Sequence, residues 1–142
     1  MRVNWPLKLI FYISFTLLYV TGVLHYVLGF SRWEFPWPTP MQTTILHAHG
    51  VVGIWFLFFF GHFFRSHILP SLGQWRHRRT GITLFVTLGF LSLSVPFLYY
   101  MGDEKLRYGM AAIHTWIGIA VIVPLIIHIA LALYDRKRRP VS

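Results

Sequence analysis

Two histidines, His114 and His128, bracket thirteen mostly apolar residues. On an α-helix, these 14 steps place the rings about 21 Å apart along the axis and about 40° apart around it, so both lie on one face. Histidine is costly inside a bilayer, and two on one face of one span indicate a shared purpose. Imidazole is a common metal ligand, so the pair predicts metal ligation. The alternative is that each ring only hydrogen-bonds a neighbouring helix.

A second set of histidines lies earlier in the chain, at positions 47, 49 and 62. His47 and His62 are separated by about 22 Å of helical rise and about 60° of rotation, whereas His49 and His62 are separated by about 20 Å and about 140°. Rotation therefore favours His47 with His62. An H-x-x-x-G pattern starts at His49 and again at His114, and a local helix bulge would bring His49 into line. We predict His47 and His62 as ligands, with His49 as the alternative to His47.

The composition is that of a membrane protein. Of the 142 residues, 56% are hydrophobic and only 12% are charged. Four apolar runs, each near the length of about 20 residues that crosses hydrocarbon, can be cut from the sequence. They cover approximately residues 7–30, 43–64, 81–101 and 110–133. We therefore predict one all-α transmembrane domain over residues 1–142, an integral membrane four-helix bundle with up-down-up-down order.

Basic residues predict the orientation of this bundle. Ten of the thirteen Lys and Arg residues precede the first run, join the second to the third, or follow the fourth. By the positive-inside rule these segments and both termini are cytoplasmic, in a multi-pass protein of a bacterial inner membrane. We interpret the net charge of +9 as a signature of topology and of contact with anionic lipid headgroups, with no nucleic acid as a partner.

The residue inventory restricts the chemistry. The sequence has no cysteine, which excludes disulfides, iron–sulfur clusters and thiolate metal sites. The loops leave no room for a soluble domain, so we expect no catalysis by this chain alone. Any cofactor must be held by histidine and by packing.

Four spans that alternate in direction make the second and fourth parallel. His47, or His49, then matches His114 in depth near the outer face, and His62 matches His128 near the inner face. This arrangement gives two sites, one near each face of the membrane, and each site has an imidazole on both sides. Haem iron with two axial histidines is six-coordinate, which suits electron transfer rather than oxygen binding.

These residues resemble the di-haem membrane cytochromes b, namely the four-helix anchors of formate dehydrogenases and nickel-iron hydrogenases and the haem-binding core of cytochrome b in the cytochrome bc complexes. The core carries His-x13-His pairs on two parallel helices. His114 to His128 has this spacing, His47 to His62 is one residue longer, and H-A-x-G from His47 to Gly50 is similar to the start of the first haem helix. The four-helix anchors commonly take a ligand from the first helix near the cytoplasm, where this chain has no histidine and His62 would substitute.

The resemblance implies two b-type haems and the role of an electron-transfer subunit in a membrane oxidoreductase complex. Glycines one turn or less from the ligands would let a porphyrin approach closely; these are Gly50, Gly53 and Gly118. Arg65 and Arg76 would contact haem propionates, and ordinary positive-inside topology is the alternative for each.

We expect electrons to pass between the quinone pool and a redox partner subunit on the periplasmic side. His25 and Glu104 lie near the outer face and are the candidate quinone contacts, because they can hydrogen-bond a carbonyl or relay protons. Two alternatives remain open on sequence grounds: a histidine-lined transporter of metal ions, and a structural membrane anchor of a complex.

Overall fold

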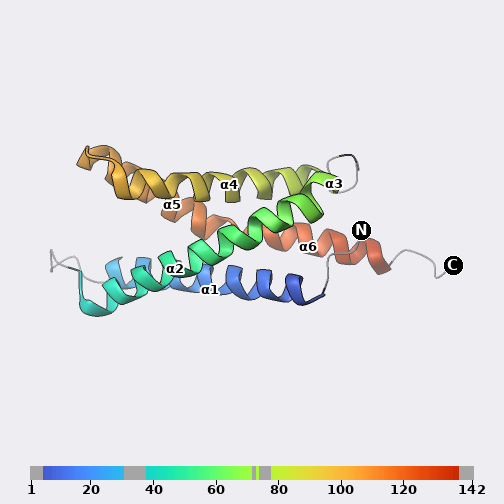
Figure 1. Ribbon diagram of the computed structural model, residues 1–142, viewed down its shortest axis with the longest axis horizontal. Helices are drawn as coiled ribbons and strands as arrows, with labels where there is room; N and C mark the ends of the chain where they lie inside the picture. Colours follow the sequence, from blue (N-terminus) through green and yellow to red (C-terminus); the bar gives the residue numbers. More distant parts are fainter. Residues whose placement is uncertain (1–4, 31–37, 72, 74–77, 138–142) are drawn as a thin grey trace. The chain divides into compact units, whose positions relative to one another are not determined.

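The computed structural model describes residues 5–30, 38–71, 73 and 78–137, and the regular structure among them is entirely helical (Figure 1). Four helical stretches are long and apolar enough to cross a membrane: Trp5–Gly29, Pro40–Ser71, Arg78–Tyr100 and Glu104–Asp135. This confirms the predicted all-α class and the four spans. The predicted order across the membrane and the position of the termini remain predictions.

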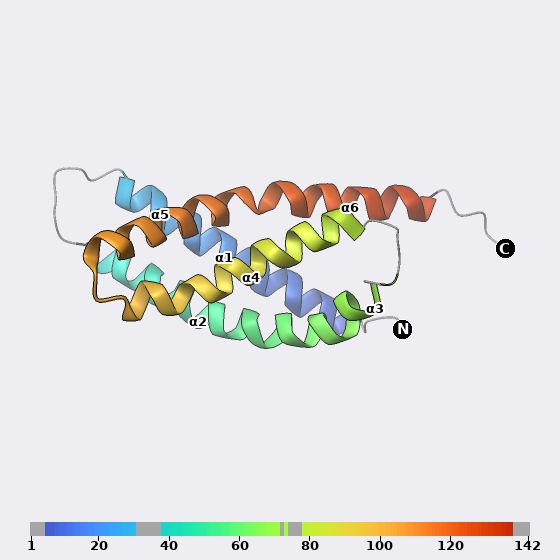
Figure 2. The same cartoon turned by 90° about the horizontal axis from the view of Figure 1, so that it is seen from above.

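The contacts divide the chain into two units, and we refer to residues 1–67 as unit 1 and to residues 68–142 as unit 2. Unit 1 is an antiparallel hairpin of α1 (Trp5–Phe30) and α2 (Pro40–Phe63). In unit 2, α4 (Arg78–Tyr100) packs against α5 (Glu104–Ala120) and α6 (Ile122–Lys137), which follow one another along nearly one line (Figure 2).

The centre of unit 1 is aromatic. Phe11 and Phe15 of α1 and Phe56 of α2 are buried. The rings of Phe11 and Phe63 stack with centroids 4.5 Å apart, and Phe56 lies 5.3 Å from Phe11. Offset and tilted ring pairs of this kind add favourable packing beyond simple contact. These ring contacts hold together the half of the hairpin that we predict to lie toward the cytoplasm.

Small and aliphatic side chains fill the centre of unit 2 instead. Leu84, Leu88 and Ser94 of α4 are buried, as is Val121 at the junction of α5 and α6. Ser94 is only 2% exposed. A buried hydroxyl needs hydrogen-bond partners, so the Ser94 hydroxyl must find them inside unit 2.

The second helical stretch, Pro40–Ser71, is longer than the sequence predicted at both ends. Thr39 and Gln42 form a capping box, with Pro40 in the first turn, so the helix begins before Thr43. At the other end a π-helical turn, η1 (Phe64–Ile68), and a short α3 (Leu69–Ser71) continue the helix. The hydroxyl of Ser66 donates to the carbonyl of His62 (2.9 Å), which competes with the regular backbone ladder where this wider turn begins.

The fourth span also begins early and is interrupted once. The Asp103 carboxylate accepts a hydrogen bond from the backbone N–H of Leu106 (2.9 Å), which caps α5 at Glu104. The helix is broken at Val121, between α5 and α6. Pro124 explains the break, because its ring clashes with the carbonyl of Ala120 and it has no N–H to donate to that carbonyl. The interruption therefore lies three residues before Pro124.

Candidate functional site

The side chain of His114 is held by the helix that precedes it in unit 2. Its Nδ1 lies 2.6 Å from the hydroxyl oxygen of Ser94 on α4. The hydroxyl of Ser94 also donates to the backbone carbonyl of Leu91 (2.8 Å). Because a serine has one hydroxyl proton, its donation to Leu91 leaves the Ser94 oxygen to accept from Nδ1–H of His114, in the tautomer whose lone pair is on Nε2.

His128 has a partner of the same kind at the other end of α4. Its Nδ1 lies 2.9 Å from the hydroxyl oxygen of Thr80. A Cβ placed on Gly81, the next residue, would lie 3.5 Å from Cε1 of the same ring. The ring of His128 therefore rests against the backbone of α4 at Gly81 while the neighbouring hydroxyl contacts its nitrogen.

His49 in unit 1 has the third such contact. Its Nδ1 lies 3.0 Å from the hydroxyl oxygen of Thr21 on α1. Thr21 in turn donates to the backbone carbonyl of Leu17 (2.7 Å) or Leu18 (3.1 Å). The Thr21 oxygen thus accepts from Nδ1–H of His49, and Nε2 again carries the lone pair.

Gly22 makes this third contact possible. A Cβ on Gly22 would lie 3.0 Å from Cε1 of His49, which is tighter than nearly all real Cβ contacts, so the ring would have to shift by a few tenths of an ångström. The absence of a side chain at this position allows the ring to lie against α1.

The other two ligand candidates of α2 point elsewhere. His47 and His62 are both exposed in the structure. His47 and His49 are two residues apart on one helix, so they face nearly opposite directions. Because His49 contacts α1, His47 points away from α1. The η1 turn lies beyond His62 and does not change the angle between His49 and His62. Their separation of about 140° around the helix therefore stands.

The predicted glycines lie where α2 and α5 meet the preceding helix. A Cβ on Gly53 would meet Leu18 of α1 at 3.7 Å, and one on Gly118 would meet Leu91 of α4 at 3.9 Å. Gly50 is half-buried. The H-x-x-x-G pattern thus places a histidine and a glycine on one face, which the preceding helix covers in each unit. A role in haem packing stays a prediction for all three glycines.

The predicted propionate contacts are only partly described. Arg65 is exposed and lies in η1, a helical turn rather than the loop that the sequence predicted. His67 is in the same turn and is also exposed. Arg76 and His77 lie outside the described residues. Arg78 and Arg79 open α4 and are exposed.

The quinone candidates belong to different units. His25 of unit 1 is half-buried, and its Nδ1 is a buried nitrogen with no hydrogen-bond partner among the described residues. Glu104 of unit 2 begins α5, where its carboxylate lies 3.9 Å from the guanidinium of Arg107. Glu104 is exposed, so its carboxylate is open to solvent or to a partner.

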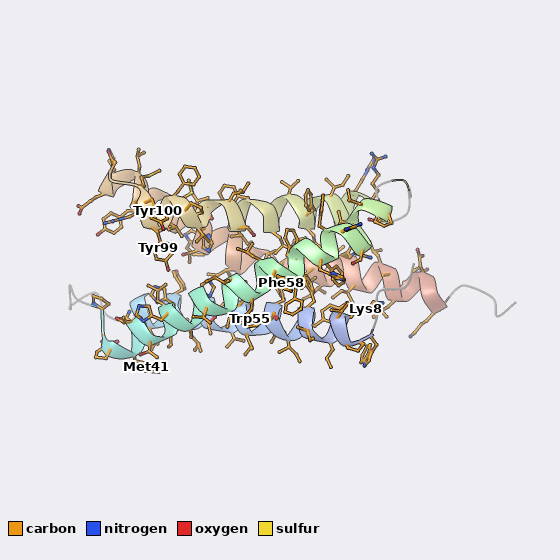
Figure 3. All side chains as sticks on the ribbon, in the orientation of Figure 1. Lys8, Met41, Trp55, Phe58, Tyr99 and Tyr100 are labelled. Carbon is orange, nitrogen blue, oxygen red and sulfur yellow. The ribbon has the colours of Figure 1, made fainter. Side chains whose placement is uncertain are left out.

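Two of the six aromatic side chains of α2 are exposed. Trp55 is 60% exposed and Phe58 is 71% exposed (Figure 3). Tyr99 and Tyr100 at the end of α4 are exposed too, as expected of residues at a membrane interface. Phe56 of α2 is buried and packs within unit 1.

The hydroxyl partners of the three histidines are functional candidates that the sequence reasoning missed, because serine and threonine are common packing residues in spans. A signal for them exists in the sequence. Thr80 and Ser94 are 14 residues apart, as are His114 and His128. In an antiparallel hairpin, equal spacing on two helices aligns both pairs in depth.

Among the described residues, no three His, Asp or Glu side chains gather into a group that could hold a metal ion. The arrangement instead offers single imidazoles, each fixed through Nδ1. A comparison of the chain with protein-family models, curated proteins and solved structures found no match.

Proposed function

We propose that the chain is a di-haem b-type cytochrome subunit that transfers electrons across a bacterial inner membrane between the quinone pool and a periplasmic redox partner. The observation that carries the proposal is the hydroxyl contact on Nδ1 of His49, His114 and His128. Metal-ligating histidines almost always hydrogen-bond through their second nitrogen, which fixes the tautomer and the direction of the ring.

The donor set fits haem better than it fits a bare metal ion. A b-type haem needs two axial imidazoles and an apolar pocket, whereas a zinc or copper site needs three or four converging ligands. Single imidazoles carried by apolar helices, in the second and fourth spans, suit the first requirement. The proposed ligands are His114, His128, His62 and one of His47 and His49. Bound haem would supply an iron that changes between two oxidation states by one electron.

The residues of this chain would perform three tasks. Ser94, Thr80 and Thr21 orient imidazoles so that Nε2 is the available nitrogen. The apolar helices exclude water from the site, which strengthens electrostatic contacts inside it. Arg65, and Arg76 by its place in the sequence, would pair with propionates, since arginine binds carboxylates in a bidentate way.

The proposal is tested by absorbance of the purified protein. We expect a reducible b-type Soret and α band, with two haems per chain. Protein purified from haem-replete cells without these bands would overturn the proposal, and stoichiometric zinc or copper in such a sample would favour a metal transporter. Co-purification of a multihaem or molybdenum subunit would identify the redox partner.

Quinone handling is proposed at His25 and Glu104. The unpartnered Nδ1 of His25 supports its part, because a buried nitrogen without a partner can bind a quinol hydroxyl. His25→Ala and Glu104→Gln variants that keep both haems should be reduced more slowly by a quinol analogue. Unchanged rates in both would place quinone elsewhere and leave these residues as bystanders.

The proposed topology, with both termini cytoplasmic, can be tested cleanly because the chain has no native cysteine. A Ser142→Cys variant should resist a membrane-impermeant thiol reagent added outside the cell, and a Gly102→Cys variant should react. Gly102 precedes α5 and is exposed. The opposite labelling pattern would invert the topology.

A further inference from the structure

The same dipeptide contacts a histidine ring in both units. Thr21-Gly22 of α1 meets His49, and Thr80-Gly81 of α4 meets His128. In each case the threonine oxygen faces Nδ1 and the glycine faces Cε1 of the same ring. We call each dipeptide a Thr-Gly seat.

The two residues of a seat have separate tasks. The hydroxyl oxygen faces Nδ1 of the ring, and a hydrogen bond at one ring nitrogen selects the tautomer. The glycine lets the edge of the ring reach the helix backbone, and the hypothetical Cβ distances are 3.0 Å at Gly22 and 3.5 Å at Gly81. The first distance is tighter than nearly all real Cβ contacts, and the second is an ordinary van der Waals contact. The Gly22 seat is therefore the tighter of the two.

We propose that the Thr-Gly seats are positioning elements for axial haem ligands, each of which holds one imidazole with Nδ1 protonated and Nε2 available to iron. This inference rests on the proposed function and adds to it. It assigns His49, rather than His47, as the ligand from the first half of α2, because His49 occupies a seat and His47 is exposed.

Ser94 provides an internal comparison. It accepts from His114 as a seat threonine would, but Val95 follows it instead of glycine. His114 therefore has the hydroxyl contact without a glycine beside it. Removal of its hydroxyl partner should affect each of the three histidines. Addition of a methyl group at the residue after the hydroxyl should affect His49 most.

The hydroxyl is tested with Thr21→Val and Thr80→Val, which keep the branched shape, and with Thr21→Ser and Thr80→Ser, which keep the oxygen. We expect each valine variant to bind one haem about 10- to 100-fold more weakly. The haem that is bound more weakly should also show an altered midpoint potential and altered low-spin g values. The serine variants should restore both values, which a purely structural role of the side chain would not require.

A second measurement does not need haem. In the haem-free protein labelled with ¹⁵N-histidine, the ring nitrogen shifts of His49 and His128 report which nitrogen is protonated. We expect the Nδ1–H form in the wild type and a mixture of tautomers in the valine variants. Rings that are mixed already in the wild type would overturn the inference.

The glycine is tested with Gly22→Ala, with Gly81→Ala as a graded comparison and Gly89→Ala as the control. A Cβ on Gly89 of α4 meets nothing within 4 Å. We expect Gly22→Ala to lose one haem and the other two variants to retain both. Equal haem content in all three would contradict the tight seat.

Failure of this inference differs from failure of the proposed function. Wild-type protein without haem refutes the function and the inference with it. Wild-type protein with two haems, whose affinity and potentials do not change in Thr21→Val and Thr80→Val, refutes the seats alone.

Discussion

The two units differ in the side chains that fill the space between their helices. In unit 1, aromatic rings of α1 and α2 fill one half of the hairpin, with Phe11 stacked on Phe63, and His49 is held in the other half. In unit 2, α4 presents a hydroxyl toward a histidine at two depths, with leucines buried between them. Unit 1 therefore holds one imidazole and unit 2 holds two.

The difference explains the exposure of His62. Phe63, its neighbour, turns toward α1 to stack on Phe11, and adjacent helical residues point about 100° apart. His62 is thereby directed away from the hairpin. A hairpin can orient a histidine toward its own partner helix or present it outward. Unit 1 does both, with His49 and His62 respectively.

The largest expected effect is the loss of a haem from unit 2. His114→Ala and His128→Ala should each lower the haem content from two per chain toward one, because no other histidine lies in α5 or α6 to replace either ring. Pyridine haemochrome assay against protein concentration measures this. His67→Ala, in the exposed η1 turn, is the control. Two haems in either main variant would refute the assignment of the fourth span.

The next comparison concerns the two histidines at the start of α2. His49→Ala should lose one haem, whereas His47→Ala should retain both, because only His49 has its Nδ1 fixed by a neighbouring hydroxyl. The reverse result would support the rotation argument, which pairs His47 with His62, and would make the Thr21 contact ordinary packing between helices.

A smaller effect should separate the two cores. Phe56→Ala in unit 1 should lower the free energy of unfolding by about 4 kcal/mol and Leu84→Ala in unit 2 by about 3 kcal/mol, since the larger ring leaves the larger cavity. Thermal unfolding in detergent ranks the variants. Phe58→Ala is the control, because Phe58 is 71% exposed. A loss as large in the control as in Phe56→Ala would contradict the described aromatic core.

The smallest expected effect is at the helix caps, one in each unit. Thr39→Ala and Asp103→Ala should each cost about 1 kcal/mol, because the first backbone N–H groups of α2 and α5 lose their side-chain acceptor. Faster amide exchange in the first turn of each helix measures the loss. Thr44→Ala removes a hydroxyl that bonds only a carbonyl of its own helix, so exchange there should not change.

Hydrophobic run length was sufficient to predict four spans, because a helix that crosses hydrocarbon must be long and apolar. The ends of α2 were not predicted. A cap such as Thr39 with Gln42 lies outside the apolar run, and a π turn leaves no hydropathic trace. Each depends on local hydrogen bonds that a search for apolar length does not consider.

The candidate site was predicted in part. Spacing identified His114 and His128, since a 14-residue interval keeps one helical face. The choice between His47 and His49 was made from rotation within α2 alone, but the contact of His49 depends on α1. The hydroxyl partners were missed because serine and threonine in a span are common packing residues. Ser94 and Thr80 differ from the other hydroxyl residues of α4 only when α4 is aligned against α5 and α6.

The break at Val121 has a consequence for how this span responds to mutation. His114 and His128 lie on separate helical segments, and their hydroxyl partners are about 21 Å apart along α4. Effects at sites so distant usually add. A double variant of Ser94→Ala with Thr80→Val should therefore show the sum of the single effects on the two potentials. Each potential could then change in evolution without altering the other.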